Sequence, residues 1–122
     1  VTQKKRLIEI TTLLINDIKK LEQIFLHDVP YTFQSEKDFN HVKAETEPIF
    51  ERLEEWEKLV LDKINKRIIS FPITMVDSTV DNISAYIMHS FYKDVRKRRY
   101  IEIKQSSLYV LRLLLKELND EN

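Results

Sequence analysis

The sequence contains no glycine and no cysteine, and each absence excludes a class of site. Phosphate-binding loops and the dinucleotide-binding fingerprint need glycine, because the backbone there takes positive φ angles and approaches the phosphate closely. Without cysteine, the chain has no disulfide, no thiolate-bound metal, no iron–sulfur cluster and no thiol nucleophile. Glycine-loop nucleotide sites and thiol chemistry are therefore excluded.

Long apolar runs and an excess of charge of one sign are also missing. No stretch approaches the roughly 20 apolar residues that span a membrane. The chain has 20 basic and 20 acidic residues, so no overall field attracts nucleic acid or anionic membrane. The basic N-terminal residues lead into an amphipathic pattern and not into the apolar block of a signal peptide. We therefore expect a cytoplasmic protein without a membrane segment.

Apolar residues at helical spacing dominate the sequence. They recur at steps of three and four residues in four stretches, which predict helices near residues 3–27, 36–68, 74–93 and 97–118. Four amphipathic helices with short connections favour antiparallel neighbours around a shared core. The predicted fold is all-α: a single antiparallel, up-down-up-down four-helix bundle over residues 1–122.

The stripes also predict which side chains form the core. The residues expected to be buried are Leu14, Leu53, Trp56, Ile83, Ile87, Leu108 and Leu111. Tyrosines near these stripes are expected at the edge of the core, each with its ring buried and its hydroxyl in water: Tyr86, Tyr92, Tyr100 and Tyr109. Pro48 lies inside the second predicted helix and should bend or break it, with Thr46 or Glu47 capping the second part.

Helix ends are indicated by proline and by capping patterns. Pro30 disfavours helix at the residue before it, so the first helix should end shortly upstream, near His27, and residues 27–34 should form a loop. Ser35 followed by Asp38 has the spacing of a capping box. Thr74 followed by Asp77 has the same spacing and predicts the start of the third helix.

Catalytic and metal-binding patterns are weak. Bundles that hold two metals use a Glu-x-x-His motif on each of two helices, and the nearest match here is Asp38-x-x-His41, which occurs once. Ser90 follows His89, but adjacent residues on a helix diverge by about a quarter turn. We interpret Ser90 as a packing residue and His89 as a boundary residue. We expect no catalytic residue, no bound metal and no cofactor, which argues against an enzyme.

Charge is distributed unevenly along the chain. Residues 93–104 include six basic and two acidic residues, whereas residues 36–62 include nine acidic and four basic ones. The candidate binding residues form this basic turn: Tyr92, Lys93, Arg96, Lys97, Arg98, Arg99, Tyr100 and Lys104. One interpretation is a phosphate or nucleic-acid site with Tyr92 and Tyr100 as stacking rings.

The other interpretation of the basic turn is a solvated connection between helices. An up-down bundle places the turn at the same end as the start of the second helix. The expected ion pairs then join some of Arg96, Arg98 and Arg99 to some of Glu36, Asp38 and Glu45. We favour this interpretation, because nucleic-acid modules usually show a larger basic excess.

A segment near the C-terminus carries a family resemblance. It comprises Ser90-Phe91-Tyr92, Lys97-Arg98-Arg99-Tyr100, Glu102-Ile103, Ser106, Leu108-Tyr109 and Leu111, with upstream similarity at Asp38-Phe39, Val42, Trp56 and Pro72. In these residues the chain resembles the YppE-like proteins, small proteins of Gram-positive bacteria with a four-helix bundle fold. The resemblance implies the bundle and a cytoplasmic location. It implies no catalytic or binding residue, because the family has no assigned activity.

Two functional hypotheses follow. The first is a non-enzymatic binding or adaptor module that acts through protein–protein contacts, with a protein partner and with the chain itself as a monomer or weak homodimer. The alternative is a small anion- or nucleic-acid-binding protein that uses the basic turn at residues 92–104. A catalyst built on His41, His89 and the glutamates is the least favoured class.

Overall fold

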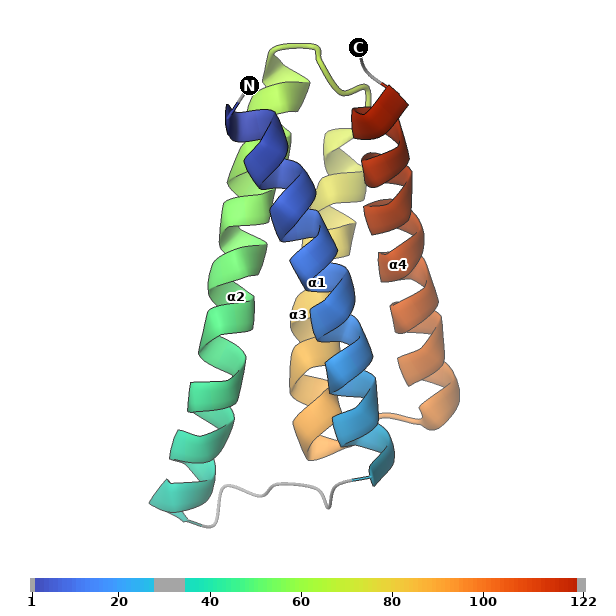
Figure 1. Cartoon of the computed structure of the whole chain (residues 1–122). Helices are drawn as coiled ribbons and strands as arrows, with labels where there is room; N and C mark the ends of the chain where they lie inside the picture. Colours follow the sequence, from blue (N-terminus) through green and yellow to red (C-terminus); the bar gives the residue numbers. More distant parts are fainter. Residues whose placement is uncertain (1, 28–34, 121–122) are drawn as a thin grey trace.

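The structure, a computed structural model, describes residues 2–27 and 35–120 and consists of four helices. These are α1 (Thr2–His27), α2 (Glu36–Asn65), α3 (Ile73–Tyr92) and α4 (Lys97–Asp120), and the described residues form no strand. Successive helices run in opposite directions (Figure 1). The predicted all-α four-helix bundle is confirmed. No helix within the described ranges has the length and apolar character needed to cross a membrane.

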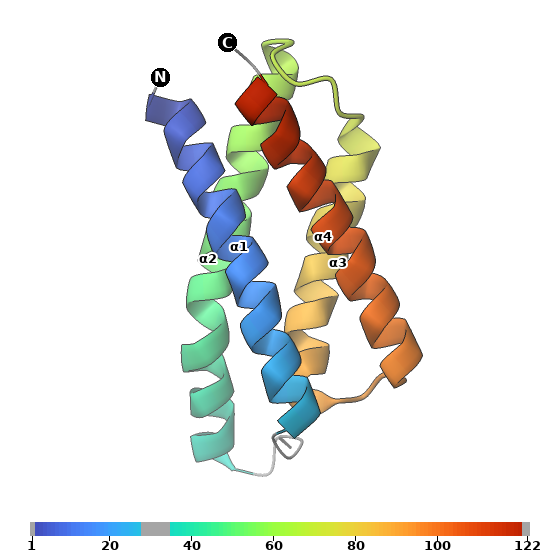
Figure 2. The ribbon, with the colours of Figure 1, turned by 45° about the vertical axis from the view of Figure 1, so that its right-hand side comes forward.

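The four helices are not equivalent in their contacts. Helix α1 packs against all three others, and α3 does the same, whereas α2 and α4 do not contact each other. Helices α1 and α3 therefore meet across the centre of the bundle, and α2 and α4 occupy opposite corners, as Figures 1 and 2 show from two directions.

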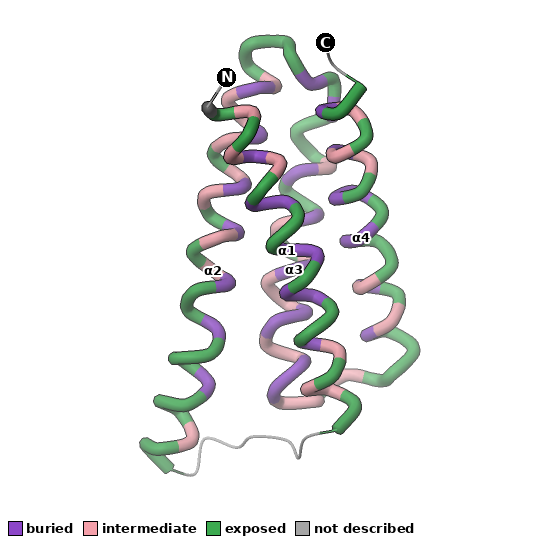
Figure 3. The backbone as a smooth tube through the Cα atoms, in the orientation of Figure 1, coloured by how far each residue is buried: buried purple, intermediate pink, exposed green. Residues whose placement is uncertain are grey.

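The core lies where the apolar stripes of the helices face one another (Figure 3). The seven core residues predicted from the apolar stripes are all buried: Leu14, Leu53, Trp56, Ile83, Ile87, Leu108 and Leu111. Trp56 is fully enclosed, and its indole Nε1 donates a hydrogen bond to Thr11 Oγ1 at 3.1 Å. The Thr11 hydroxyl in turn donates to the Leu7 carbonyl at 2.6 Å, so the polar atoms of this pair are satisfied inside the core.

The predicted cap of α2 is confirmed. Helix α3 starts within one residue of its predicted start, but the predicted cap by Thr74 is wrong. Ser35 Oγ accepts a hydrogen bond from the Asp38 backbone N–H at 3.1 Å, as expected of an N-cap. Helix α3 instead begins at Ile73 after Pro72, without a side-chain cap. The ring of Pro72 fixes φ at −63°, which positions the chain for the helix one residue before Thr74.

Two helices end at residues with positive φ, where glycine is usual. Helix α1 ends at His27 as predicted, and the loop predicted after it lies outside the described residues from residue 28 onward. Helix α2 ends three residues earlier than predicted, because Arg67 takes a left-handed φ of 58° and the Ile68 N–H bonds back to the Lys63 carbonyl. Lys93 closes α3 in the same region, with φ 53° and a 2.8 Å hydrogen bond to the His89 carbonyl.

Pro48 does not break α2, so of the two predicted outcomes the break with a cap at Thr46 or Glu47 is wrong, and the bend stays a prediction. The proline ring removes one backbone hydrogen bond, the one that the Ala44 carbonyl would accept. Buried side chains on both sides of the proline, including Thr46 and Ile49, pack into the bundle and hold the helix together. Packing therefore outweighs the local preference.

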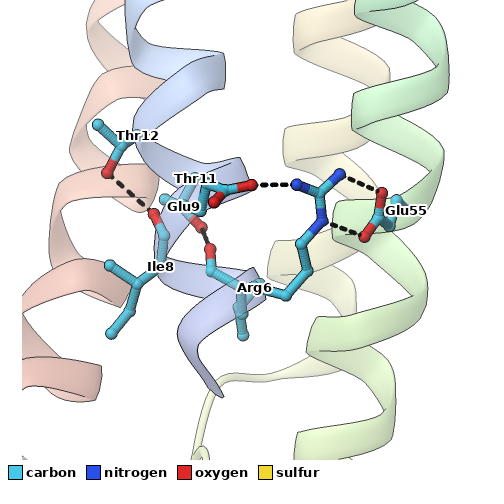
Figure 4. A network of polar contacts seen from close by, with 7 residues as sticks. Arg6, Ile8, Glu9, Thr11, Thr12 and Glu55 are labelled. Carbon is cyan, nitrogen blue, oxygen red and sulfur yellow. Dashed lines mark hydrogen bonds and ion pairs between the residues drawn. The ribbon is translucent and has the colours of Figure 1, made fainter. Parts of the chain in front are cut away.

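Charged side chains join α1 to α2 at two levels. The Arg6 guanidinium donates to both Glu55 carboxylate oxygens, at 2.6 and 2.8 Å, and also contacts Glu9 (Figure 4). Hydrogen bonds from Arg6 lower the pKa of the Glu55 carboxyl. Arg52 makes the same two-point contact with Asp17, at 2.7 and 2.8 Å. These five charged side chains are engaged in ion pairs within the molecule.

Replacing Ile87 with alanine should lower the free energy of unfolding by about 2–5 kcal/mol, because the side chain is fully buried and its removal leaves a cavity. Urea denaturation followed by circular dichroism measures the change. Leu26→Ala is the matched control, since Leu26 is 45% exposed and its loss should change the stability by no more than about 0.5 kcal/mol. Equal effects of the two substitutions would contradict the packing described above.

Candidate functional site

The basic turn connects α3 to α4 and presents four exposed cations, Arg96, Lys97, Arg98 and Arg99. Arg98 lies 4.0 Å from Glu102 on the same helix. Within the described part of the chain, no ion pair joins these arginines to the acidic residues at the start of α2, so that prediction is wrong. The reason is geometric: α2 and α4 occupy opposite corners of the bundle.

Two of the candidate binding residues are engaged inside the molecule. Tyr100 is 1% exposed and its ring lies nearly parallel to those of Phe25 and Tyr86, with centroids 3.7 and 4.2 Å away. It is therefore not available to stack on an external base. Lys104 Nζ donates to Glu22 Oε2 at 2.7 Å, which links α4 to α1.

The tyrosine hydroxyls of this cluster lie inside the core, contrary to the prediction that they would reach water. Ser90 Oγ donates to the Tyr86 carbonyl at 2.6 Å, so the Tyr100 hydroxyl, also 2.6 Å away, donates to Ser90. The Tyr86 hydroxyl is buried and has no hydrogen-bond partner among the described residues. Burial raises the pKa of Tyr100 to about 12 and raises the pKa of Tyr86 above its ordinary range.

Histidine and serine side chains near this cluster do not form a catalytic arrangement. Ser90 is a buried packing residue, as predicted, and its hydroxyl donates to a backbone carbonyl. His89 is partly buried at the boundary, and its Nδ1 lies 2.6 Å from Asp94 Oδ1. This hydrogen bond lowers the pKa of Asp94. Among the described residues, no three His, Asp or Glu side chains are grouped closely enough to hold a metal ion.

The outer face of α4 carries an exposed surface that the sequence analysis did not identify. We define the α4 outer face by its exposed stripe: Arg98, Glu102, Gln105, Tyr109, Arg112 and Lys116. Tyr109, predicted to bury its ring, is 65% exposed, the highest value among the large hydrophobic side chains of the described residues. The signal was present in the sequence, because the steps of three, four and seven residues place this stripe opposite the apolar one.

Shallow hollows flank Tyr109 on both sides. One, of about 560 Å³, follows α4 past Leu108 and Leu113, and the other, of about 440 Å³, lies between α3 and α4 beside Met75 and Val110. Arg112 and Lys116 border the first hollow, and neither forms an ion pair with another described residue. The arrangement is a ridge with an aromatic side chain at its crest, one flank that includes Leu108 and Leu113, one flank that is mainly polar, and two cations without an ion pair to a described residue.

A smaller groove lies between α1 and α2. It has a volume of about 300 Å³ and an apolar lining that includes Leu21, Ile49 and Phe91. Arg52 and Asp17, which pair with each other, form part of its rim. The other charged side chains of its lining are Lys20 and Glu45.

The fold and the surface define the class of protein. It is an all-α antiparallel bundle whose candidate binding surfaces, the basic turn and the α4 outer face, are exposed. Residues 11–118 match a family described as "Bacterial domain of unknown function (DUF1798)", and the chain belongs to this family. No curated protein matches the sequence.

Two solved structures have the same fold. A protein of unknown function from Listeria innocua is 16% identical, with a TM-score of 0.80 over 98% of this chain and 95% of the other. The protein yppE from Bacillus subtilis, solved by NMR in solution, is 21% identical, with a TM-score of 0.75 over 94% of each chain. The resemblance to YppE-like proteins is thus confirmed, and at these identities the structural likeness shows the fold alone.

Alkaline pH should destabilise the protein through its buried tyrosines. Because the folded-state pKa of Tyr100 is raised to about 12, its contribution to stability is fully present below the unfolded pKa of about 10 and is lost as the pH rises through about 12. Urea denaturation at several alkaline pH values should therefore give a falling free energy of unfolding. Tyr100→Phe should reduce this slope, and Tyr109→Phe should not, because Tyr109 is exposed. Equal slopes in all three proteins would contradict the burial of the Tyr100 hydroxyl.

Proposed function

We propose that this chain is a non-enzymatic binding module that contacts another protein through the α4 outer face. The observation that supports this function most directly is Tyr109, which is 65% exposed on the crest of a helix with a shallow hollow on each side. A ring in this position has two open flanks that a partner can cover, one beside the apolar side chains of Leu108 and Leu113 and one beside mainly polar side chains. The same helix presents Arg112 and Lys116 without an ion pair among the described residues.

Physical chemistry favours a protein as the partner of such a ridge. Tyrosine and arginine are enriched in the energetically important parts of protein interfaces, because each combines a large contact area with a hydrogen-bonding group. Ligand pockets enclose most of a small molecule, whereas the hollows beside Tyr109 are open and lie along a convex helix. A surface of this shape is complementary to another extended surface.

The charges of the α4 outer face favour an acidic partner. Arg112 and Lys116 lie one helical turn apart and next to Tyr109. An acidic side chain that approaches the ridge gains a favourable Coulomb interaction and pays no cost for breaking an existing ion pair. Such charges set specificity and the rate of association more than the affinity.

Replacing Tyr109 with alanine should abolish capture of the partner. Removal of an interface anchor costs at least about 2 kcal/mol, which lowers affinity roughly thirtyfold. The tagged protein and its variant are used to recover proteins from an extract of the native cells, and recovery is compared by quantitative mass spectrometry. Phe39→Ala is the control, because Phe39 is an aromatic residue 47% exposed on α2. Recovery of the same proteins in the same amounts with the Tyr109 variant would refute the proposed contact face.

A second candidate function is anion or nucleic-acid binding by the basic turn. Three exposed cations, Arg96, Lys97 and Arg99, support it, because they form no ion pair with the described residues. They lie at the start of α4, whose first turn contains no acidic residue. The positive end of the helix dipole adds to their field. The buried position of Tyr100 removes one of the two rings that the sequence suggested for stacking on bases.

We expect no oligonucleotide to bind the wild-type protein at physiological salt, and fluorescence anisotropy with single-stranded RNA and DNA measures this. The test variant changes Arg96, Lys97 and Arg98 together to glutamine. A complex that weakens steeply with salt, and that the triple change abolishes, would establish the second function in place of the first. Each phosphate contact removed would then lower the slope of log affinity against log salt by about one.

A further inference from the structure

Opposite corners of the bundle carry complementary charges. On α2 the outermost residues are Lys37, Asn40, Ala44, Glu47 and Glu51, all exposed, and we call this stripe the α2 outer face. Glu47 and Glu51 form no ion pair with a described residue, in contrast to Glu54, which lies 3.3 Å from Lys58 on the same helix. On the α4 outer face, Arg112 and Lys116 likewise form no ion pair with a described residue.

These charges cannot neutralise one another within a single molecule. Helices α2 and α4 do not contact each other, because α1 and α3 meet between them. The two outer faces therefore point away from each other, toward solvent or a neighbour (Figure 1). Each copy of the chain therefore carries two surfaces of complementary charge, the α2 outer face with Glu47 and Glu51 and the α4 outer face with Arg112 and Lys116.

The spacing of the two faces is the same, residue by residue. Tyr109, Arg112 and Lys116 follow one another at steps of three and four residues, and Ala44, Glu47 and Glu51 do so as well. Helices α2 and α4 also run in the same direction in the bundle (Figure 1). A second copy in the same orientation can therefore place its α2 alongside α4 with the two stripes in register.

In this register the five positions of the α4 outer face from Glu102 to Lys116 each meet a residue of the α2 outer face. Arg112 faces Glu47 and Lys116 faces Glu51, with each pair separated from the next by about 6 Å along the helix. The large ring of Tyr109 faces Ala44, the small residue of the α2 outer face. One turn earlier the polar residues Gln105 and Asn40 meet, and Glu102 faces Lys37, so that the complementarity continues beyond the free charges. Every charge of the α4 outer face from Glu102 to Lys116 opposes a charge of the other sign, and Arg98 lies beyond the start of the opposing stripe.

We infer that the α4 outer face binds the α2 outer face of a second copy of this chain. The inference rests on the proposed function, in that it takes the α4 outer face as the contact surface and names its partner. The contact is head-to-tail, because it joins two different faces, and further copies can add at either end. It is weak and sensitive to salt, because exposed ion pairs are screened and contribute little individually.

Charge reversal and charge exchange test this inference in the intact chain. Sedimentation velocity of the wild type at low ionic strength should show weight-average mass rising with protein concentration, and added salt should suppress the rise. Arg112→Glu with Lys116→Glu should lower the association constant about tenfold or more, and Glu47→Lys with Glu51→Lys should do the same. An equimolar mixture of the two double variants should recover association, because each then offers the other a complementary face. Lys5→Glu with Lys19→Glu makes the same change of charge at exposed positions of α1 and should have no effect.

Cross-linking gives a second measurement that does not depend on charge. The chain has no cysteine, so Asn40→Cys in one preparation and Gln105→Cys in another provide single thiols at facing positions. A short bis-maleimide should link the two variants to each other faster than it links Asn40→Cys to a Leu13→Cys control. A wild type that remains monomeric at low salt, or double variants that fail to associate when mixed, would overturn the inference. Loss of partner capture by Tyr109→Ala in a protein that stays monomeric would leave the proposed function standing and remove only this choice of partner.

Discussion

The contact between α1 and α3 across the centre of the bundle determines what the other two helices can do. Because these helices touch, α2 and α4 are held at opposite corners and present their outer faces in opposite directions. The acidic residues of α2 and the basic residues of α4 are thereby separated, although the chain as a whole is neutral. A bundle in which α2 and α4, and not α1 and α3, met across the centre would have brought these charges closer together.

Polar groups inside the core give the packing its specificity. The Trp56 indole reaches Thr11, and the Tyr100 hydroxyl reaches Ser90, so each pair fixes one helix against another at a defined height. A purely apolar core tolerates small sliding of helices, whereas a buried hydrogen bond with a donor and an acceptor on different helices does not. The stack of Tyr100 on Phe25 further joins the start of α4 to the end of α1. The two contacts of Tyr100 thus anchor the start of α4, where the basic turn ends, to α3 and α1.

The sequence predicted the helices and their buried faces because both depend on local periodicity. Trp56 lies on an apolar stripe, and its burial follows from that position. Helix ends were harder to predict, since Arg67 and Lys93 take left-handed conformations that a glycine-free chain must assign to other residues. The continuity of α2 through Pro48 also depends on tertiary packing, which local preferences do not contain.

The candidate site could be predicted less well, for a related reason. Exposure of a residue depends on which helices are neighbours. Periodicity alone does not predict which two opposite helices meet across the centre of the bundle. Tyr100 shows the consequence, because it was expected at the edge of the core and is enclosed by two aromatic rings. The exposure of Tyr109, in contrast, follows from its place in the stripe opposite the apolar one. The functional surface of a neutral bundle is thus fixed by how its helices are arranged. Composition sets the number of charges, and the arrangement decides which of them remain free to meet a partner.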